Sequence, residues 1–178
     1  MGRRRAKGLL TVTNVPQARL VLSDVELVRD RLEDEEDERE WRLDWALAVV
    51  LLRTVGDVLH KVDGALNPAV LQAANALYRT WSEGAENQIF REFIKKERDS
   101  IVHEYRSTMS EGPIIVLNVA AALSKYPMSV ENLLDDNLFR PMMDGPYAGQ
   151  DGRDLVDEAI RWWRIQLDKV DQMASQWP

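Results

Sequence analysis

Apolar positions spaced three and four residues apart recur along most of the chain, and this spacing predicts helices. They dominate from Arg39 to Val62, where the middle is apolar almost all round. That pattern indicates a central helix covered by neighbours on several sides, and we expect Asp63-Gly64 to end it. Asn67 and Pro68 are typical of the N-cap and first position of a further helix, which we expect to run through Trp81.

Two later segments have the same spacing. A third helix is expected from about Glu83 to Ser107, stopped by Ser110-Glu111-Gly112-Pro113. Its apolar side should hold Ile89, Phe90, Phe93, Ile94, Ile101 and Tyr105. A last helix is expected to start between Asp151 and Asp154. It should bury Leu155, Ala159, Trp162, Trp163, Gln166 or Leu167, Val170 and Met173.

The remaining segments define the domain boundaries. Residues 1–22 are expected to form an N-terminal arm, and Ser23 with Glu26 forms a capping-box pattern that predicts the start of the first helix. Between Ile114 and Gly152 the pattern does not decide: IIVLNVAAAL fits a strand or a buried helix, and 140–152 is rich in turn residues. The prediction is an all-α antiparallel bundle of four to six helices. It forms a single helical domain over 23–178, whose C-terminal helix covers about 152–174.

Composition narrows the class of protein. The chain has 178 residues, 45% of them hydrophobic and 30% charged, which is typical of one globular domain. The longest apolar run, Trp45 to Leu52, has eight residues, whereas a membrane span needs about 20. The start of the chain lacks the apolar core of a signal peptide, and there is no cysteine. We therefore expect a cytoplasmic protein with no membrane segment.

The net charge of −7 argues against a broad nucleic-acid surface, but the charge is unevenly distributed. The block EDEEDE, residues 33–38, contributes −6, so the rest of the chain is nearly neutral and has room for a compact positive cluster. Like charges within the block favour a break in the helix near Glu35 to Glu38. The block is expected to be a solvated helix face or a mobile segment, with a docking surface as the alternative.

Several common sites are absent from the sequence. It contains no glycine-rich phosphate-binding motif, no G-x-S-x-G and no H-E-x-x-H. Two histidines without cysteine are a poor set of zinc ligands, and 135–137 lacks the spacing of a calcium loop. We expect no metal site and no cofactor.

One short stretch, ERDSIVHEYR, concentrates reactive side chains. Residues Arg98 to Tyr105 within it resemble the R-x4-H-x-Y motif of HEPN domains, a family of small helical nucleases, and Asp99 fits the polar residue that follows the arginine. The resemblance covers about 39–107 at the level of the fold and eight residues at the level of the motif. Arg53 and His60 also fit a looser arginine–histidine spacing but lack the flanking residues, so we predict a structural role for that pair.

The resemblance implies metal-independent endoribonuclease activity, in which the ribose 2′-hydroxyl attacks the adjacent phosphate. His103 would act as general base or acid, and Arg98 would stabilise charge on the phosphoryl oxygens. Asp99 would hold the imidazole in one tautomer, and Tyr105 would line the site or bind a phosphate. Lys95 and Lys96 would bind the RNA backbone.

The resemblance also implies a homodimer. Positions 98 and 103 point about 140° apart on one straight helix, so residues from two protomers would have to meet in one cleft. A toxin or phage-defence protein, restrained by a protein antitoxin or another regulator, is the biological role that such a nuclease suggests.

Three other interpretations remain open. The motif can be an ordinary exposed charged face, with His103 partly buried and Tyr105 in the core; its charged members would be Glu97, Arg98, Asp99, Glu104 and Arg106. The chain can be a non-catalytic protein-interaction module that uses its tryptophans and the acidic block. It can also be a nucleotide-binding module that uses Arg98 and Lys95. Core positions are expected for Trp41, Trp45, Trp81, Trp162 and Trp163.

Overall fold

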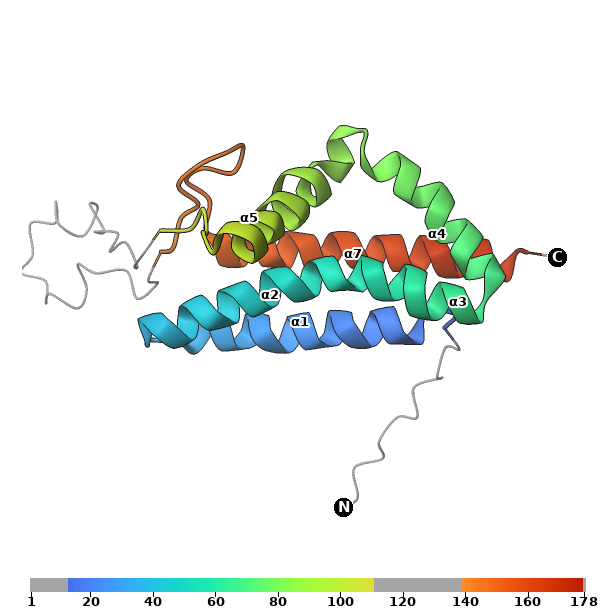
Figure 1. Ribbon diagram of the computed structural model, residues 1–178, viewed down its shortest axis with the longest axis horizontal. Helices are drawn as coiled ribbons and strands as arrows, with labels where there is room; N and C mark the ends of the chain where they lie inside the picture. The colour runs from blue at the N-terminus through green and yellow to red at the C-terminus, as the bar shows by residue number, and fades with distance from the viewer. Residues whose placement is uncertain (1–12, 111–138, 178) are drawn as a thin grey trace, which may run out of the picture.

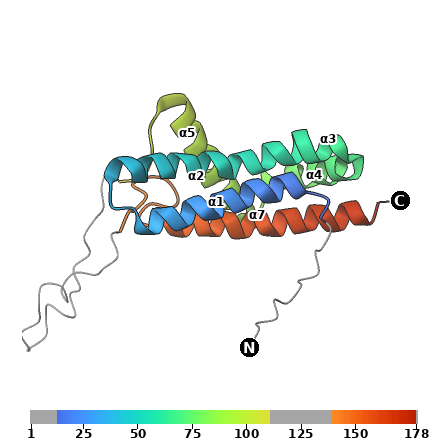
Figure 2. The same cartoon turned by 90° about the horizontal axis from the view of Figure 1, so that it is seen from below.

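Three long helices lie side by side and a bent arch of shorter helices packs against them (Figures 1 and 2). The computed structural model describes residues 13–110 and 139–177. The long helices are α1 (Pro16–Asp34), α2 (Glu38–Val58) and α7 (Gly152–Ser175). The arch consists of α4 (Pro68–Trp81) and a second arm formed by the π-helix η3 (Ile89–Lys95) and α5 (Lys96–Glu104).

The prediction of an all-α bundle is confirmed. The described residues contain five α-helices of nine or more residues and no strand. Helix α1 runs antiparallel to both α2 and α7, whereas α2 and α7 run in the same direction (Figure 1). No helix of the described residues combines the length and the apolar character that crossing a bilayer requires.

The first helix starts earlier than the sequence pattern indicated. It begins at Pro16, in the first helical position that proline favours, and Ser23 lies inside it with its hydroxyl bonded to the Leu20 carbonyl. The capping-box prediction is therefore wrong, and residues 16–22 belong to the bundle rather than to an arm. No side chain at Val15 caps the helix; Asp63 supplies the cap instead by accepting the backbone N–H groups of residues 17 and 18 at 3.1 and 2.8 Å.

The helical segment that begins with α2 runs past the end that the sequence suggested. After α2 it continues without interruption through a π-helical turn, η1 (Leu59–Asp63), and a last α-turn, α3 (Gly64–Leu66). Asp63-Gly64 is thus inside the helical segment. Asp63 is 2% exposed and caps α1, a role that local sequence does not reveal. The next helix is as predicted: the Asn67 side chain accepts the N–H of Ala69, and α4 runs from Pro68 to Trp81.

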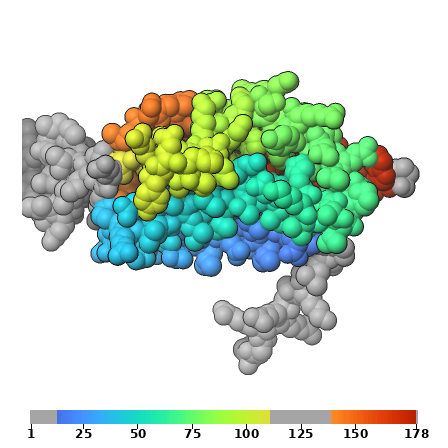
Figure 3. Space-filling view, in the orientation of Figure 1, coloured from blue at the N-terminus to red at the C-terminus, as the bar shows by residue number. Residues whose placement is uncertain are grey.

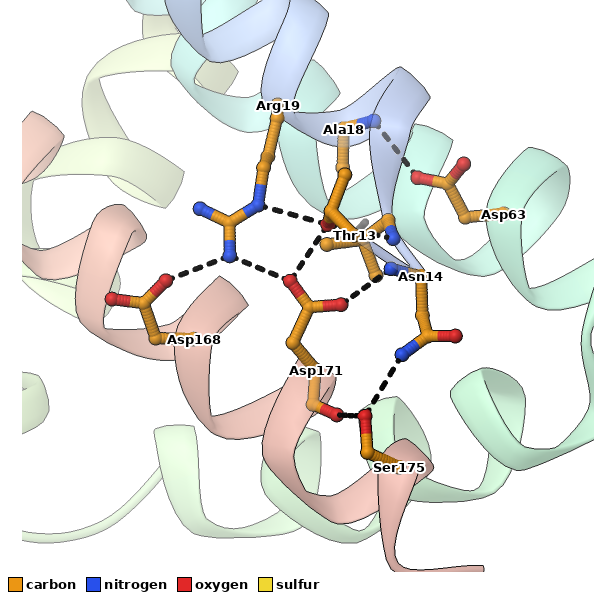
Figure 4. A network of polar contacts seen from close by, with 9 residues as sticks. Thr13, Asn14, Ala18, Arg19, Asp63, Asp168, Asp171 and Ser175 are labelled. Carbon is orange, nitrogen blue, oxygen red and sulfur yellow. Dashed lines mark hydrogen bonds and ion pairs between the residues drawn. The ribbon is translucent and has the colours of Figure 1, made fainter. Parts of the chain in front are cut away.

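The start of α1 is tied to the last turns of α7 by polar contacts (Figure 4). The carboxylate of Asp171 accepts the Thr13 hydroxyl at 2.7 Å and the backbone N–H of Asn14 at 2.6 Å. Arg19 donates to Asp171 and to Asp168, both at 2.7 Å. Burial alone would raise the pKa of Asp171, but the hydrogen bonds from Thr13, Arg19 and Asn14 outweigh it and hold that pKa below the usual 3.8.

The acidic block is the connection between α1 and α2. Its members serve separate structural roles: Asp37 caps α2 by accepting two backbone N–H groups, Glu33 pairs with Arg29, and Glu38 pairs with Arg140. The predicted break near Glu35 to Glu38 is confirmed, because the residues 35–37 that separate the two helices are not helical.

An aromatic cluster joins α4, η3 and α7. Trp81 lies 5.2 Å from Trp162 and 5.3 Å from Trp163, and Phe90 stacks on Trp162 at 5.1 Å between ring centroids. Two indole N–H groups are satisfied by buried amides, since Trp81 donates to Gln166 and Trp162 donates to Asn87. The core positions predicted for the five tryptophans are confirmed: Trp41, Trp45, Trp81, Trp162 and Trp163 are 6% exposed or less.

The predicted apolar faces of the last two helices need two corrections. Tyr105 is 73% exposed and lies beyond the end of α5, so it is not on the apolar side. Met173 is 39% exposed, and Ala174 takes the buried position in the last turn of α7. Residues 140–151 form a turn-rich loop as expected, with Asp151 capping α7. The segment IIVLNVAAAL and the rest of 111–138 lie outside the described residues.

Candidate functional site

The motif occupies α5 and the turn that follows it. Glu97 and Ile101 face the core with 3% and 9% exposure, while Asp99, His103 and Tyr105 are at least partly exposed. The helix therefore buries one side and presents the side chains of chemical interest to solvent. Glu97 is therefore not part of an exposed charged face, because its carboxylate lies in the interior.

Glu97 fixes the segment that follows α5. Its carboxylate accepts the Ser107 hydroxyl at 2.7 Å and both the N–H and the hydroxyl of Thr108. The indole N–H of Trp45, on α2, donates to the same carboxylate at 3.2 Å. These hydrogen bonds replace the water that a buried carboxylate loses, and they tie 107–108 back against α5 and α2. Sequence reasoning missed this residue, although its spacing from Ile94 and Ile101 places it on the apolar side.

Arg98 is paired within its own helix. Its guanidinium donates to the Asp99 carboxylate at 2.8 Å, and the two side chains are 31% and 44% exposed. The structure therefore places Asp99 against Arg98 and not against the His103 ring that it was expected to orient. Because this ion pair is partly exposed to solvent, it positions the arginine near the surface but contributes little to stability.

His103 is exposed in the last turn of α5. Its side chain makes no hydrogen bond, ion pair or ring contact within 13–110 and 139–177. Arg98 and His103 lie about 140° apart around the helix axis, and a single copy of α5 does not direct them to one point.

Tyr105 ends α5 in a left-handed conformation. Its φ and ψ are 52° and 38°, and it is the one residue other than glycine with positive φ in the described residues. The turn lets Ser100 bracket residue 106, since its carbonyl accepts the Arg106 N–H at 3.4 Å and its hydroxyl donates to the Arg106 carbonyl at 2.9 Å. A bulky side chain in this region costs about 1–2 kcal/mol relative to a right-handed conformation.

The Tyr105 ring borders a groove of about 880 Å³ between α2 and the segment after α5, here called the Tyr105 groove. Arg39, Arg42 and Arg106 line it. Arg140 lines it as well, but its guanidinium is committed: it forms two hydrogen bonds to Glu38 and lies 4.1 Å from the Trp41 ring centroid. The Tyr105 groove therefore has a positive wall next to the end of the motif.

Lys95 and Lys96 lie on the other side of α5. Both are exposed and line a second groove of about 500 Å³ between α4 and the η3–α5 arm, together with Asp99. Lys96 is paired with Glu92. The motif is thus divided: Asp99 borders the second groove, Tyr105 borders the first, and neither Arg98 nor His103 is among the lining residues of these two grooves.

The other arginine–histidine pair, Arg53 and His60, has a different geometry. The two positions are seven apart along the helical segment, which places them on nearly the same face, and both line a groove of about 240 Å³ beside Tyr78. Nδ1 of His60 lies 2.9 Å from the Gly56 carbonyl. Because a carbonyl only accepts, Nδ1 carries the proton and Nε2 is the unprotonated nitrogen of the neutral ring. Arg53 pairs with Asp57 at 3.3 Å.

No group of three or more potential metal-ligating side chains occurs among the described residues. Comparison with known protein families, with curated proteins and with solved structures gives no match. The chemical interpretation of the site therefore rests on the residues and their geometry.

Proposed function

We propose that the protein is a metal-independent endoribonuclease whose active site is built from Arg98, His103 and Tyr105. The observation that carries the proposal is the division of α5 into two sides. Glu97 and Ile101 are buried and anchor the helix, while Arg98 is partly exposed and His103 and Tyr105 are exposed. Tyr105 has an exposed ring on a left-handed backbone, a conformation that costs free energy, and residues strained in this way cluster at functional sites.

The chemistry uses His103 for proton transfer and Arg98 for stabilising charge. His103 removes the proton of a ribose 2′-hydroxyl, whose oxygen then attacks the adjacent phosphorus. A 2′-oxygen–phosphorus bond forms, the bond to the 5′-oxygen breaks, and the products are a 2′,3′-cyclic phosphate and a 5′-hydroxyl. The departing 5′-oxygen takes this proton from the now protonated His103 ring. Arg98 donates hydrogen bonds to the non-bridging phosphoryl oxygens as their charge grows.

Two copies of the chain are needed for this chemistry. Arg98 and His103 diverge by about 140° around α5, so one protomer does not bring both to a single phosphate. In a symmetric dimer packed along the exposed side of α5, Arg98 of one copy faces His103 of the other. Val102, which is 49% exposed, lies between them and supplies apolar area for such a contact.

The test is RNA cleavage by the purified full chain in excess EDTA. Wild type is compared with His103→Ala and Arg98→Ala, and His60→Ala is the matched control because the chain has only these two histidines. We expect each motif variant to lose about 100-fold or more in rate, and His60→Ala to lose much less, because the His60 ring lies outside the motif and packs against Tyr78. Intact RNA with folded wild-type protein would overturn the proposal and leave a binding module. Loss in His60→Ala alone would move the site to the groove of Arg53 and His60.

A further inference from the structure

The groove between α4 and the η3–α5 arm carries an excess of positive charge. We call it the Tyr78 groove, after the aromatic residue at its edge, and Figure 3 shows α4, η3 and α5 together on one face of the molecule. Four cationic residues line it, Arg79, Arg91, Lys95 and Lys96, against two acidic ones, Glu92 and Asp99. The local charge is thus +2, in a chain whose net charge is −7.

The acidic residues of the groove already have partners. Lys96 pairs with Glu92, and Arg98 pairs with Asp99. Arg79, Arg91 and Lys95 form no ion pair with a carboxylate in the part of the chain that the structure describes; Arg91 donates only to the Gly84 carbonyl, at 3.0 Å. Three cations therefore line a groove whose two acidic residues are paired with other side chains, an arrangement suited to successive phosphates.

Tyr78 gives the groove a rigid aromatic surface. Its ring makes T-shaped contacts with the rings of His60, Trp81 and Phe90, at centroid distances of 5.7, 5.6 and 6.3 Å. The residue is nevertheless 46% exposed. The three neighbouring rings restrict the orientation of the Tyr78 ring while nearly half of the residue stays accessible to solvent. A nucleic-acid base can stack on a ring held in this way with little loss of side-chain entropy.

We propose that the Tyr78 groove binds single-stranded RNA, with one base stacked on Tyr78 and neighbouring phosphates held by Arg79, Arg91 and Lys95. A single strand is required because a base inside a duplex already has both faces stacked. The inference rests on the proposed function for its choice of RNA, and it places the strand beside the motif, since Asp99 lines the groove and binds Arg98. An acidic peptide would use the same cations but would have no need of the exposed ring.

The test measures binding without cleavage. A fluorescein-labelled RNA of about 12 nucleotides is titrated with the full chain carrying His103→Ala, in EDTA, and anisotropy is recorded at several salt concentrations. We expect Tyr78→Leu to weaken binding about tenfold and Tyr78→Phe to preserve it. Lys95→Ala should weaken binding, and Lys169→Ala should not, because that exposed lysine is on α7. The double variant Arg79→Ala/Lys95→Ala should reduce the salt slope by about 1.4, or 0.7 per phosphate.

The outcomes separate this inference from the ribonuclease proposal. Four results would each overturn RNA binding by the Tyr78 groove. They are unchanged binding in Tyr78→Leu, equal effects of Lys95→Ala and Lys169→Ala, equal affinity for the matching duplex, and no binding by folded protein. If RNA binding weakens in Arg79→Ala/Lys95→Ala but not in Tyr78→Leu, no base stacks on Tyr78. The groove would then be a purely electrostatic site, as an acidic peptide would need. If groove variants bind weakly while wild type cleaves nothing, the groove stands and the nuclease fails. If wild type cleaves and groove variants bind normally, only the groove fails.

Discussion

Glu97 and Thr108 lie eleven residues apart and are joined through both hydrogen-bond donors of the threonine, because one carboxylate accepts its backbone N–H and its hydroxyl. This pair turns the end of α5 into a closed local structure. The motif residues His103 and Tyr105 lie inside that closure, so their positions depend on a carboxylate that takes no part in the proposed chemistry. The relationship has measurable consequences for stability and for activity.

Replacing Glu97 should destabilise the protein and the site together. Glu97→Ala leaves the hydroxyl of Ser107 and both donors of Thr108 without their acceptor, and it removes one of the two acceptors of the Trp45 indole N–H; we expect a loss of about 3 kcal/mol in the free energy of unfolding. Urea unfolding followed by circular dichroism measures it. Glu104→Ala is the control, since Glu104 is exposed and contacts only Arg106, at 3.6 Å; its effect should stay within about 0.5 kcal/mol. Equal effects of the two changes would contradict the anchoring role.

Tyr105 should show a trade between stability and activity. Tyr105→Gly removes a side chain that is 73% exposed and relieves a left-handed conformation, so we expect the free energy of unfolding to rise by about 0.5–1 kcal/mol. RNA cleavage should fall in the same variant because the ring borders the Tyr105 groove. Tyr105→Phe, which keeps ring and backbone strain, should have wild-type stability. A destabilised Tyr105→Gly protein would show that the ring is needed for folding.

Mixing two inactive variants should restore activity if each cleft takes Arg98 from one copy and His103 from the other. After Arg98→Ala and His103→Ala proteins are mixed and allowed to exchange subunits, half of the dimers are mixed, and each has one intact cleft. Recovery should therefore approach about a quarter of wild-type activity. The control is each variant mixed with itself. Recovery near zero, with exchange confirmed, would mean that both residues act within one protomer or that the site has another composition.

The contact between α1 and α7 should weaken in acid. The pKa of Asp171 is below 3.8 in the folded protein, since hydrogen bonds from Thr13 and Arg19 outweigh the effect of burial, so its contribution to stability is full above the unfolded-state pKa. That contribution is lost as the pH falls through the lower folded-state pKa. We expect Asp171→Asn to cost about 1–2 kcal/mol at pH 7, with the difference from wild type narrowing below about pH 4. Ser175→Ala, in the same network but without an ionising group, should have the same effect at both pH values.

Much of the fold could be predicted from the spacing of apolar residues. The segments that became α2, α4 and α7, and the buried tryptophans, follow from helical periodicity and from the Asn67-Pro68 start. The start of α1 could not, because its cap comes from Asp63, 45 residues from Ala18. The π-turns at η1 and η3 leave no mark in a pattern that is averaged over several turns.

For the candidate site, the sequence indicates which residues to consider but not their surroundings. It could indicate that Arg98, His103 and Tyr105 share a short segment, but not that α5 ends at Glu104, because the left-handed residue that ends a helix is usually glycine or asparagine and here is tyrosine. The pairing of Asp99 with Arg98 depends on side-chain rotamers. The Tyr78 groove joins residues from α4 and η3, and no local pattern connects them.

The polar network between Thr13 and Asp171 also bears on how the chain is made. The two residues are 158 positions apart, so the start of α1 meets its partners only after nearly all the intervening chain has left the ribosome. Until then, the sides of α1 and α2 that α7 will cover have no partner and are open to premature association. Packing of this bundle is therefore completed only after α7 has been synthesised, and fragments that stop before α7 should be substrates for chaperones and proteases.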